Sequence, residues 1–251
     1  MTIFQHLKND QRLQDAPEFV HLLLCRLSIA EVVAASKFKK PIVDEVELES
    51  NVIKKIREKC NALNYSAPRT DAIASIFKEI VTIAKLIQTA WLIQSKDTSD
   101  AVVKREAISL AKAITLTEVT NDNILTSIRE YATKLTSQIL DSLNKPEGIG
   151  QLEIVTSLLK ECFPHIDVSK LDNAIITMSR GIDELKLMSI ADEDLDDTII
   201  VDFGVEGQIV ERPSLSDGLK ENGIFRPAAR ASNDGLGTQQ HQNNWLGCTI
   251  S

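Results

Sequence analysis

Two cations, Arg26 and Lys37, lie on a face of a predicted helix that is otherwise apolar. The face runs Leu22, Arg26, Ile29, Val33 and Lys37, in steps of three and four residues, through the segment RLSIAEVVAASK. Eleven residues return an α-helix to about the same face, roughly 16 Å further along its axis. Burying an unpaired cation is costly, so the pattern predicts either internal carboxylate partners or a bound anion. In the alternative, both side chains extend along the apolar face and carry their charges to the solvent.

A polar amide interrupts a second apolar face, in the segment IFKEIVTIAKLIQTAWL. Phe77, Ile80, Ala84, Gln88 and Trp91 follow one another at helical spacing, so the Gln88 side chain is expected to point inward. The residues of this face offer it no side-chain partner. A buried amide usually finds a partner in the neighbouring backbone, and the alternative is a hydrogen bond to a bound ligand.

The composition is typical of a soluble globular protein that is rich in helix. Of 251 residues, 43% are hydrophobic, 25% are charged and only 4% are aromatic. The net charge is −8 without a basic stripe, which argues against nucleic acid as a partner. The cysteines form no CxxC pair and the histidines lack HExxH spacing, so we expect no metal site. The absence of an apolar leader and of a span-length run predicts a cytosolic protein.

Helical periodicity predicts an all-α fold, a single-chain bundle of about six or seven helices. The predicted helices span 16–39, 44–63, 70–95, 100–115, 121–143, 149–162 and 168–188. We expect residues 1–188 to form the helical domain and residues 189–212 to form an acidic linker with a small β-hairpin. Residues 213–251 are rich in Gly, Ser, Asn and Gln and are expected to be disordered.

The segments RLSIAEVVAASKFKKPIVD and IFKEIVTIAKLIQTAWL closely resemble the all-helical chorismate mutases. The match is closest to their gamma class, in which one chain carries both halves of the bundle. In that family an RL…VAxxK helix runs into a PIxD turn, and a later helix carries an IQ or IE pair. The resemblance covers about residues 15–185 and implies the family's helical fold. It also implies that Arg26, Lys37 and Gln88 contact the substrate and that Asp44 belongs to the PIxD turn.

A later segment, LTSIREYATKLTSQIL, resembles the helix that supplies a second cation in the gamma class. Lys134 lies where that class has an arginine, just before the matching SQI. Two positions depart from the family pattern. Glu47 stands where the PIxDxxR motif has its second arginine, and Ala84 replaces a small hydroxylated residue. A carboxylate at position 47 would repel a substrate carboxylate, which weakens the implied substrate site.

The reaction that the resemblance implies is the rearrangement of chorismate to prephenate, which needs no nucleophile, metal or cofactor. A catalyst must hold a flexible dicarboxylate in its reactive conformer and stabilise negative charge on the ether oxygen. The resemblance assigns the two carboxylates to Arg26 and Lys134, and the ether oxygen to Lys37 and Gln88. An amide at position 88 donates its N–H at any pH, whereas a glutamate must first be protonated.

Two other functions are compatible with the same residues. A pseudoenzyme could keep the helical bundle as a scaffold that binds another protein at a membrane, and Glu47 and Ala84 favour this alternative. An enzyme of the isochorismate pyruvate lyase kind would use a similar pocket for a related dicarboxylate. Because one chain carries both halves of the bundle, we expect a monomer or a homodimer.

The sequence ends in Cys248-Thr249-Ile250-Ser251, which has the form of a C-a-a-X box read by farnesyltransferase. A single lipid without a nearby basic patch gives only marginal membrane binding. Chorismate chemistry is bacterial, fungal or plant, whereas prenylation needs a eukaryotic cytosol. The combination suggests an effector that an intracellular bacterium delivers into its host, where Cys248 anchors it to a membrane.

If Cys248 is prenylated, a Cys248→Ser variant expressed in a eukaryotic cell will move from the membrane fraction to the soluble fraction. The lost lipid supplies the membrane affinity, so fractionation and immunoblotting measure the effect directly. If the protein's distribution between the two fractions does not change, the anchoring hypothesis is wrong.

Overall fold

The computed structural model describes residues 2–38, 45–120, 122–145 and 149–193, and every regular element in these ranges is helical. The elements are α1 (Ile3–Asn9), the 3-10 helix η1 (Gln11–Leu13), α2 (Glu18–Ser36), α3 (Glu45–Ala62), α4 (Ala67–Ser95), α5 (Asp100–Thr115), α6 (Ile124–Leu143), α7 (Leu152–Cys162) and α8 (Val168–Glu193). All of them belong to one compact unit, Met1–Asp197. The predicted all-α bundle is confirmed.

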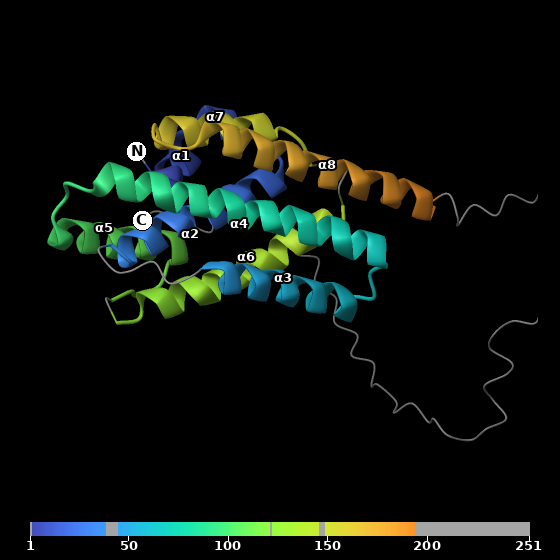
Figure 1. Cartoon of the computed structure of the whole chain (residues 1–251), viewed down its shortest axis with the longest axis horizontal. Coiled ribbons are helices and arrows are strands. Elements are labelled where there is room, and N and C mark those ends of the chain that lie inside the picture. The colour runs from blue at the N-terminus through green and yellow to red at the C-terminus, as the bar shows by residue number, and fades with distance from the viewer. Residues whose placement is uncertain (1, 39–44, 121, 146–148, 194–251) are drawn as a thin grey trace, which may run out of the picture. The chain divides into compact units, whose positions relative to one another are not determined.

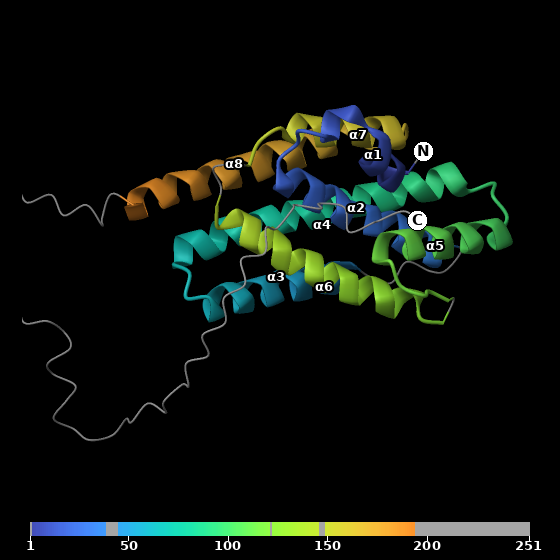
Figure 2. The ribbon, with the colours of Figure 1, turned by 180° about the vertical axis from the view of Figure 1, so that it is seen from behind.

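Helix α2 lies at the centre of the bundle and packs against α1, α4, α5, α6 and α7 (Figures 1 and 2). Its buried residues face every side, as the run of three consecutive leucines 22–24 shows. Within the described part of the chain, α2 is the one helix long and apolar enough to cross a membrane, but 72% of that stretch is buried inside the bundle. The core helix of a soluble protein has the same properties.

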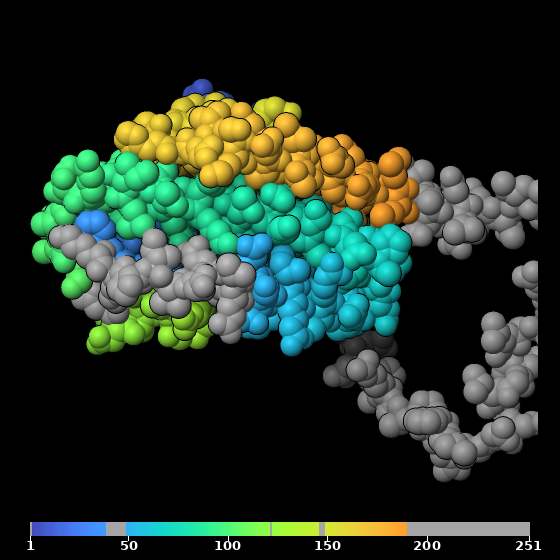
Figure 3. Space-filling model, in the orientation of Figure 1, coloured from blue at the N-terminus to red at the C-terminus, as the bar shows by residue number. Residues whose placement is uncertain are grey.

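Helices α4 and α8 make the most extensive helix pair of the unit and lie side by side on one face (Figure 3). Gly181 of α8 permits their close approach. A Cβ atom at this position would lie 3.0 Å from Cγ1 of Ile76 and 3.5 Å from the carbonyl oxygen of Ala72, both in α4. The missing side chain therefore sets the spacing of this pair.

The seven predicted helices all exist, and most of their bounds agree to within three residues. Helix α4 begins at Ala67 instead of residue 70, because the Ser66 hydroxyl accepts a hydrogen bond from the Arg69 amide and Pro68 fits a first helical turn. Helix α8 runs on to Glu193, beyond the predicted domain end at 188. The expected hairpin, the tail and Cys248 lie outside the described residues.

The structure adds an amino-terminal helix, α1, that the periodicity does not predict. Thr2 and Gln5 form a reciprocal capping box, in which the Gln5 amide donates to the Thr2 hydroxyl and the Thr2 amide donates to the Gln5 side chain. Seven residues are too few for a helix to be stable alone, so packing of Ile3 and Leu7 against the bundle must hold it in place.

A Gly181→Val change is expected to lower the free energy of unfolding by about 1–3 kcal/mol, because the new side chain must push α4 and α8 apart. Urea denaturation followed by circular dichroism measures the loss. Gly150→Val is the matched control: a Cβ at Gly150 has no atom within 4 Å, so that variant should change stability little. Equal effects of the two changes would contradict the packing role of Gly181.

Candidate functional site

Arg26 lies midway along the central helix, and its side chain is half-buried. Protein atoms surround most of the guanidinium, and this burial lowers the pKa of Arg26 below its usual value. Among the described residues, no carboxylate lies within ion-pair distance of it and no side-chain hydrogen bond holds it. The structure therefore supports the partly buried cation predicted from the sequence, without an internal carboxylate partner in the part of the chain that it describes.

Lys37 and Gln88 lie near the same end of the α2–α4 pair. Lys37 ends α2 and is half-buried, and its backbone amide donates to the carbonyl oxygen of Val33 at 3.1 Å. The next residue, Phe38, meets Trp91 of α4 in an edge-to-face contact with ring centroids 6.0 Å apart. Gln88 lies one turn before Trp91, is half-buried, and has no side-chain hydrogen bond among the described residues. Two of the predicted donors are thus brought to one region of the bundle.

The other positions of the implied site are less well supported. Lys134 is exposed on α6, whereas its neighbour Leu135 is buried, so the structure does not bring this lysine into the core. Its role as the second cation stays a prediction. Ala84 of α4 packs partly buried against the core. Glu47 lies in the first turn of α3, and Asp44 falls outside the described residues.

A half-buried lysine that sequence reasoning did not single out lies between α3 and α6. The Lys59 ammonium donates to the Ser137 hydroxyl at 3.0 Å and, among the described residues, has no carboxylate within 4.0 Å. Ser137 belongs to the SQI segment that placed Lys134 in the resemblance. In the sequence, Lys59 lies between Ile56 and Cys60, both buried, which is the pattern of an ordinary amphipathic helix. This pattern gives no sign of a special role for Lys59.

Glu31 is a second ionisable residue of α2 that the sequence did not reveal as special. Its side chain is only 1% exposed and accepts hydrogen bonds from the Ile3 amide at 3.3 and 3.4 Å. Burial raises the pKa of Glu31 to about 8, although the Ile3 amide acts in the opposite direction. The signal available in the sequence was a lone carboxylate inside the apolar run 27–35.

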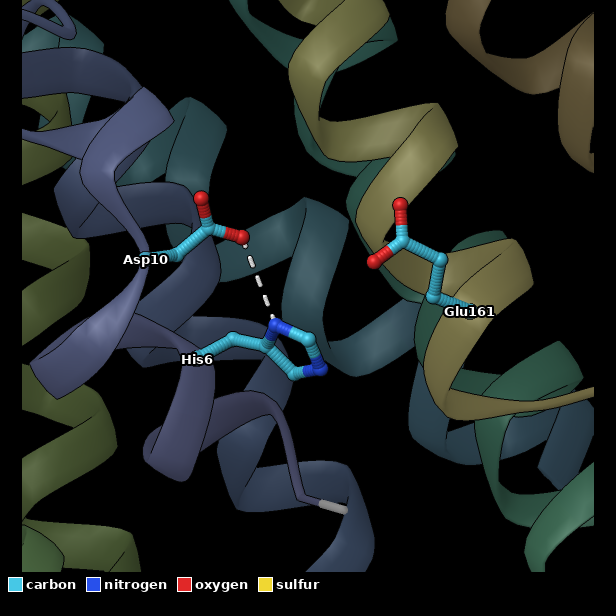
Figure 4. A group of neighbouring side chains, drawn as sticks. All are labelled: His6, Asp10 and Glu161. Atoms are coloured by element: carbon cyan, nitrogen blue, oxygen red, sulfur yellow. Dashed lines mark hydrogen bonds and ion pairs between the residues drawn. The ribbon is translucent and has the colours of Figure 1, made fainter.

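His6, Asp10 and Glu161 bring three groups that could ligate a metal within 4.8 Å of one another (Figure 4). Arg12, which Figure 4 does not draw, already binds both carboxylates. Its guanidinium donates to Glu161 at 2.8 and 2.9 Å and to Asp10 at 2.6 Å, and holds the pKa of Asp10 well below its usual range. A cation would have to displace this arginine, so the cluster acts as an ionic clasp between η1 and α7.

A shallow depression on the described surface lies over α3 and α4, lined by α3 residues between Glu49 and Asn61 and by Lys78 of α4. The lining carries both signs of charge. Two of its residues pair with side chains outside it: Glu49 with Lys85 at 2.6 Å, and Arg57 with Asp71. Arg26, Lys37 and Gln88 do not line it. This depression is therefore distinct from the site that the sequence predicts.

Comparison with known proteins identifies no relative of this chain. No model of a protein family matches it, and searches of curated proteins and of solved structures give no match.

An Arg26→Met change is expected to raise the free energy of unfolding by about 1–3 kcal/mol, because an apolar side chain of similar length replaces a partly desolvated cation. Chemical denaturation measures the gain, and the exposed Arg105 of α5 offers Arg105→Met as the control. A loss of stability specific to Arg26→Met would instead show that the guanidinium has a stabilising partner.

Proposed function

We propose that this chain binds a small dicarboxylate in its helical bundle and rearranges chorismate to prephenate. The observation that carries the proposal is Arg26, a permanently charged guanidinium in the middle of the central helix, half-buried and without a carboxylate partner among the described residues. A site that keeps such a group at a cost in stability is suited to an anionic ligand, because the ligand supplies the missing counter-charge. Arginine also binds a carboxylate in bidentate fashion.

Two further side chains support the proposal. Lys37 and Gln88 are half-buried near one end of the α2–α4 pair, where the Phe38–Trp91 contact fixes the two helices. Both are hydrogen-bond donors, and neither donates from its side chain to another described residue. Donors of this kind suit an ether oxygen that gains negative charge as its C–O bond breaks. The reaction is intramolecular, so positioning and charge stabilisation suffice.

One observation favours a second candidate function, a scaffold that binds another protein without catalysis. Lys134, the residue expected to hold the second carboxylate, is exposed on α6. Without a second cation, the substrate would lose one of its two anchors. In this alternative, Arg26 binds an anionic group of a partner.

The two functions differ in a direct assay with purified protein. If the chain is a mutase, the absorbance of chorismate falls with time and prephenate accumulates, and Arg26→Ala lowers kcat/KM by at least about a hundredfold, because a charged hydrogen bond to a carboxylate is lost. Arg105→Ala, on the exposed surface of α5, is the control and should leave the rate unchanged.

The outcomes separate the alternatives. Loss of isochorismate with release of pyruvate would assign the lyase reaction instead. Activity that emerges only in a Glu47→Arg variant would favour the scaffold, since the natural chain would then lack a cation that the chemistry needs. No turnover of either substrate by the natural chain or by that variant would refute the enzymatic proposal.

A further inference from the structure

The amino-terminal segment, residues 2–13, covers the buried Glu31 side chain. It comprises α1 and η1, and α1 packs against α2 and α7. Ile3, at the start of α1, is completely buried, and its backbone amide points at the Glu31 carboxyl group. The segment therefore shields this carboxyl from water on one side.

The other end of the segment is held by the ionic clasp at the surface. Arg12 binds Asp10 within the segment and reaches across to Glu161 and Ser157 of α7. Arg12 and Glu161 are both exposed, so solvent and salt weaken this attachment. The segment is thus attached by apolar burial at Ile3, Leu7 and Leu13, by a carboxyl contact at its start, and by exposed ion pairs at its end.

Ionisation of Glu31 would leave a poorly compensated charge inside the protein. Its described hydrogen bonds come from one amide, at the long distances of 3.3 and 3.4 Å. The described titratable group that interacts with it is the Cys162 thiol of α7, whose pKa the Glu31 charge helps to raise. The positive charge of the amino terminus favours the ionised form of Glu31. Among the described residues of α4, α5 and α6, no charged side chain pairs with it.

We propose that residues 2–13 form a pH-dependent latch, which is docked while Glu31 is protonated and released when Glu31 ionises in water. A carboxyl group that lies directly beneath a short helix can gain solvent by displacing that helix. Displacing any of the long helices around α2 would instead cost the core of the bundle.

The direction of the pH dependence follows from the two states of the carboxyl group. Docking raises the pKa of Glu31 from the usual 4.5 to about 8 through burial. The docked state therefore binds more protons than the released state between these values, so docking is strongest at low pH. The equilibrium constant for docking falls by up to about tenfold per pH unit as the pH rises through this window. Above the window it no longer changes with pH.

Hydrogen exchange of the full chain, measured by mass spectrometry at pH 5.5, 6.5 and 7.5, tests the latch. After correction for intrinsic exchange rates, protection of amides in residues 2–13 should fall about tenfold per pH unit. Protection of the amides in α4 and α8 should not fall with pH in this way. In Glu31→Gln, which keeps the side chain neutral, the segment should stay equally protected at all three pH values.

Two control variants make the result specific. Glu18→Gln removes an exposed carboxylate from the same helix and should keep the pH dependence of the natural chain. Arg12→Ala breaks the clasp and should lower the protection of residues 2–13 a few-fold at every pH, without changing how steeply this protection falls per pH unit. The proposal is overturned if protection of residues 2–13 in Glu31→Gln still falls with pH, or if these residues are unprotected in that variant even at low pH. It is also overturned if α4 and α8 of the natural chain lose protection with pH together with residues 2–13.

Discussion

The enclosure of α2 by five other helices is the constraint on which the rest of this structure depends. A helix that is apolar on nearly every side cannot face water, so the bundle must surround it. The same enclosure gives any polar group on α2 an unusual environment. A charged residue on an amphipathic surface helix would be unremarkable, whereas on α2 it is surrounded by protein.

The helices were predictable because their signals are local. Periodic apolar residues and capping residues such as Ser66 lie within each segment, and the seven longer helices follow from them. Helix α1 could not be predicted in this way, because seven residues carry too little periodicity. Its order depends on contacts with residues far along the chain, such as Glu31, and the adjoining η1 is held by Glu161 in the same way. Such contacts have no sequence signal.

The candidate site shows the same division between local and distant information. The inward positions of Arg26 in α2 and Gln88 in α4 each follow from the spacing of apolar residues within the helix concerned, and both side chains are half-buried. The placement of Lys134 rested on a resemblance in sequence position, which does not fix the rotation of α6 about its axis. Leu135 faces the core, and Lys134 is exposed beside it. The resemblance itself has no support from known relatives, so Arg26 must carry the functional argument by its environment.

Arg26 and Glu31 could in principle neutralise each other, but helix geometry prevents it. Five residues turn an α-helix by about 500°, which leaves the two side chains roughly 140° apart around α2. Their charges also respond differently to burial. Glu31 becomes neutral by holding its proton, since burial raises its pKa to about 8, whereas a guanidinium stays charged at any physiological pH. At neutral pH the enclosed part of the central helix therefore carries a cation without a matching anion, because Glu18, the other acidic residue of α2, is exposed in its first turn. Such an imbalance favours an anionic ligand at Arg26, whether that ligand is a substrate or a partner's carboxylate.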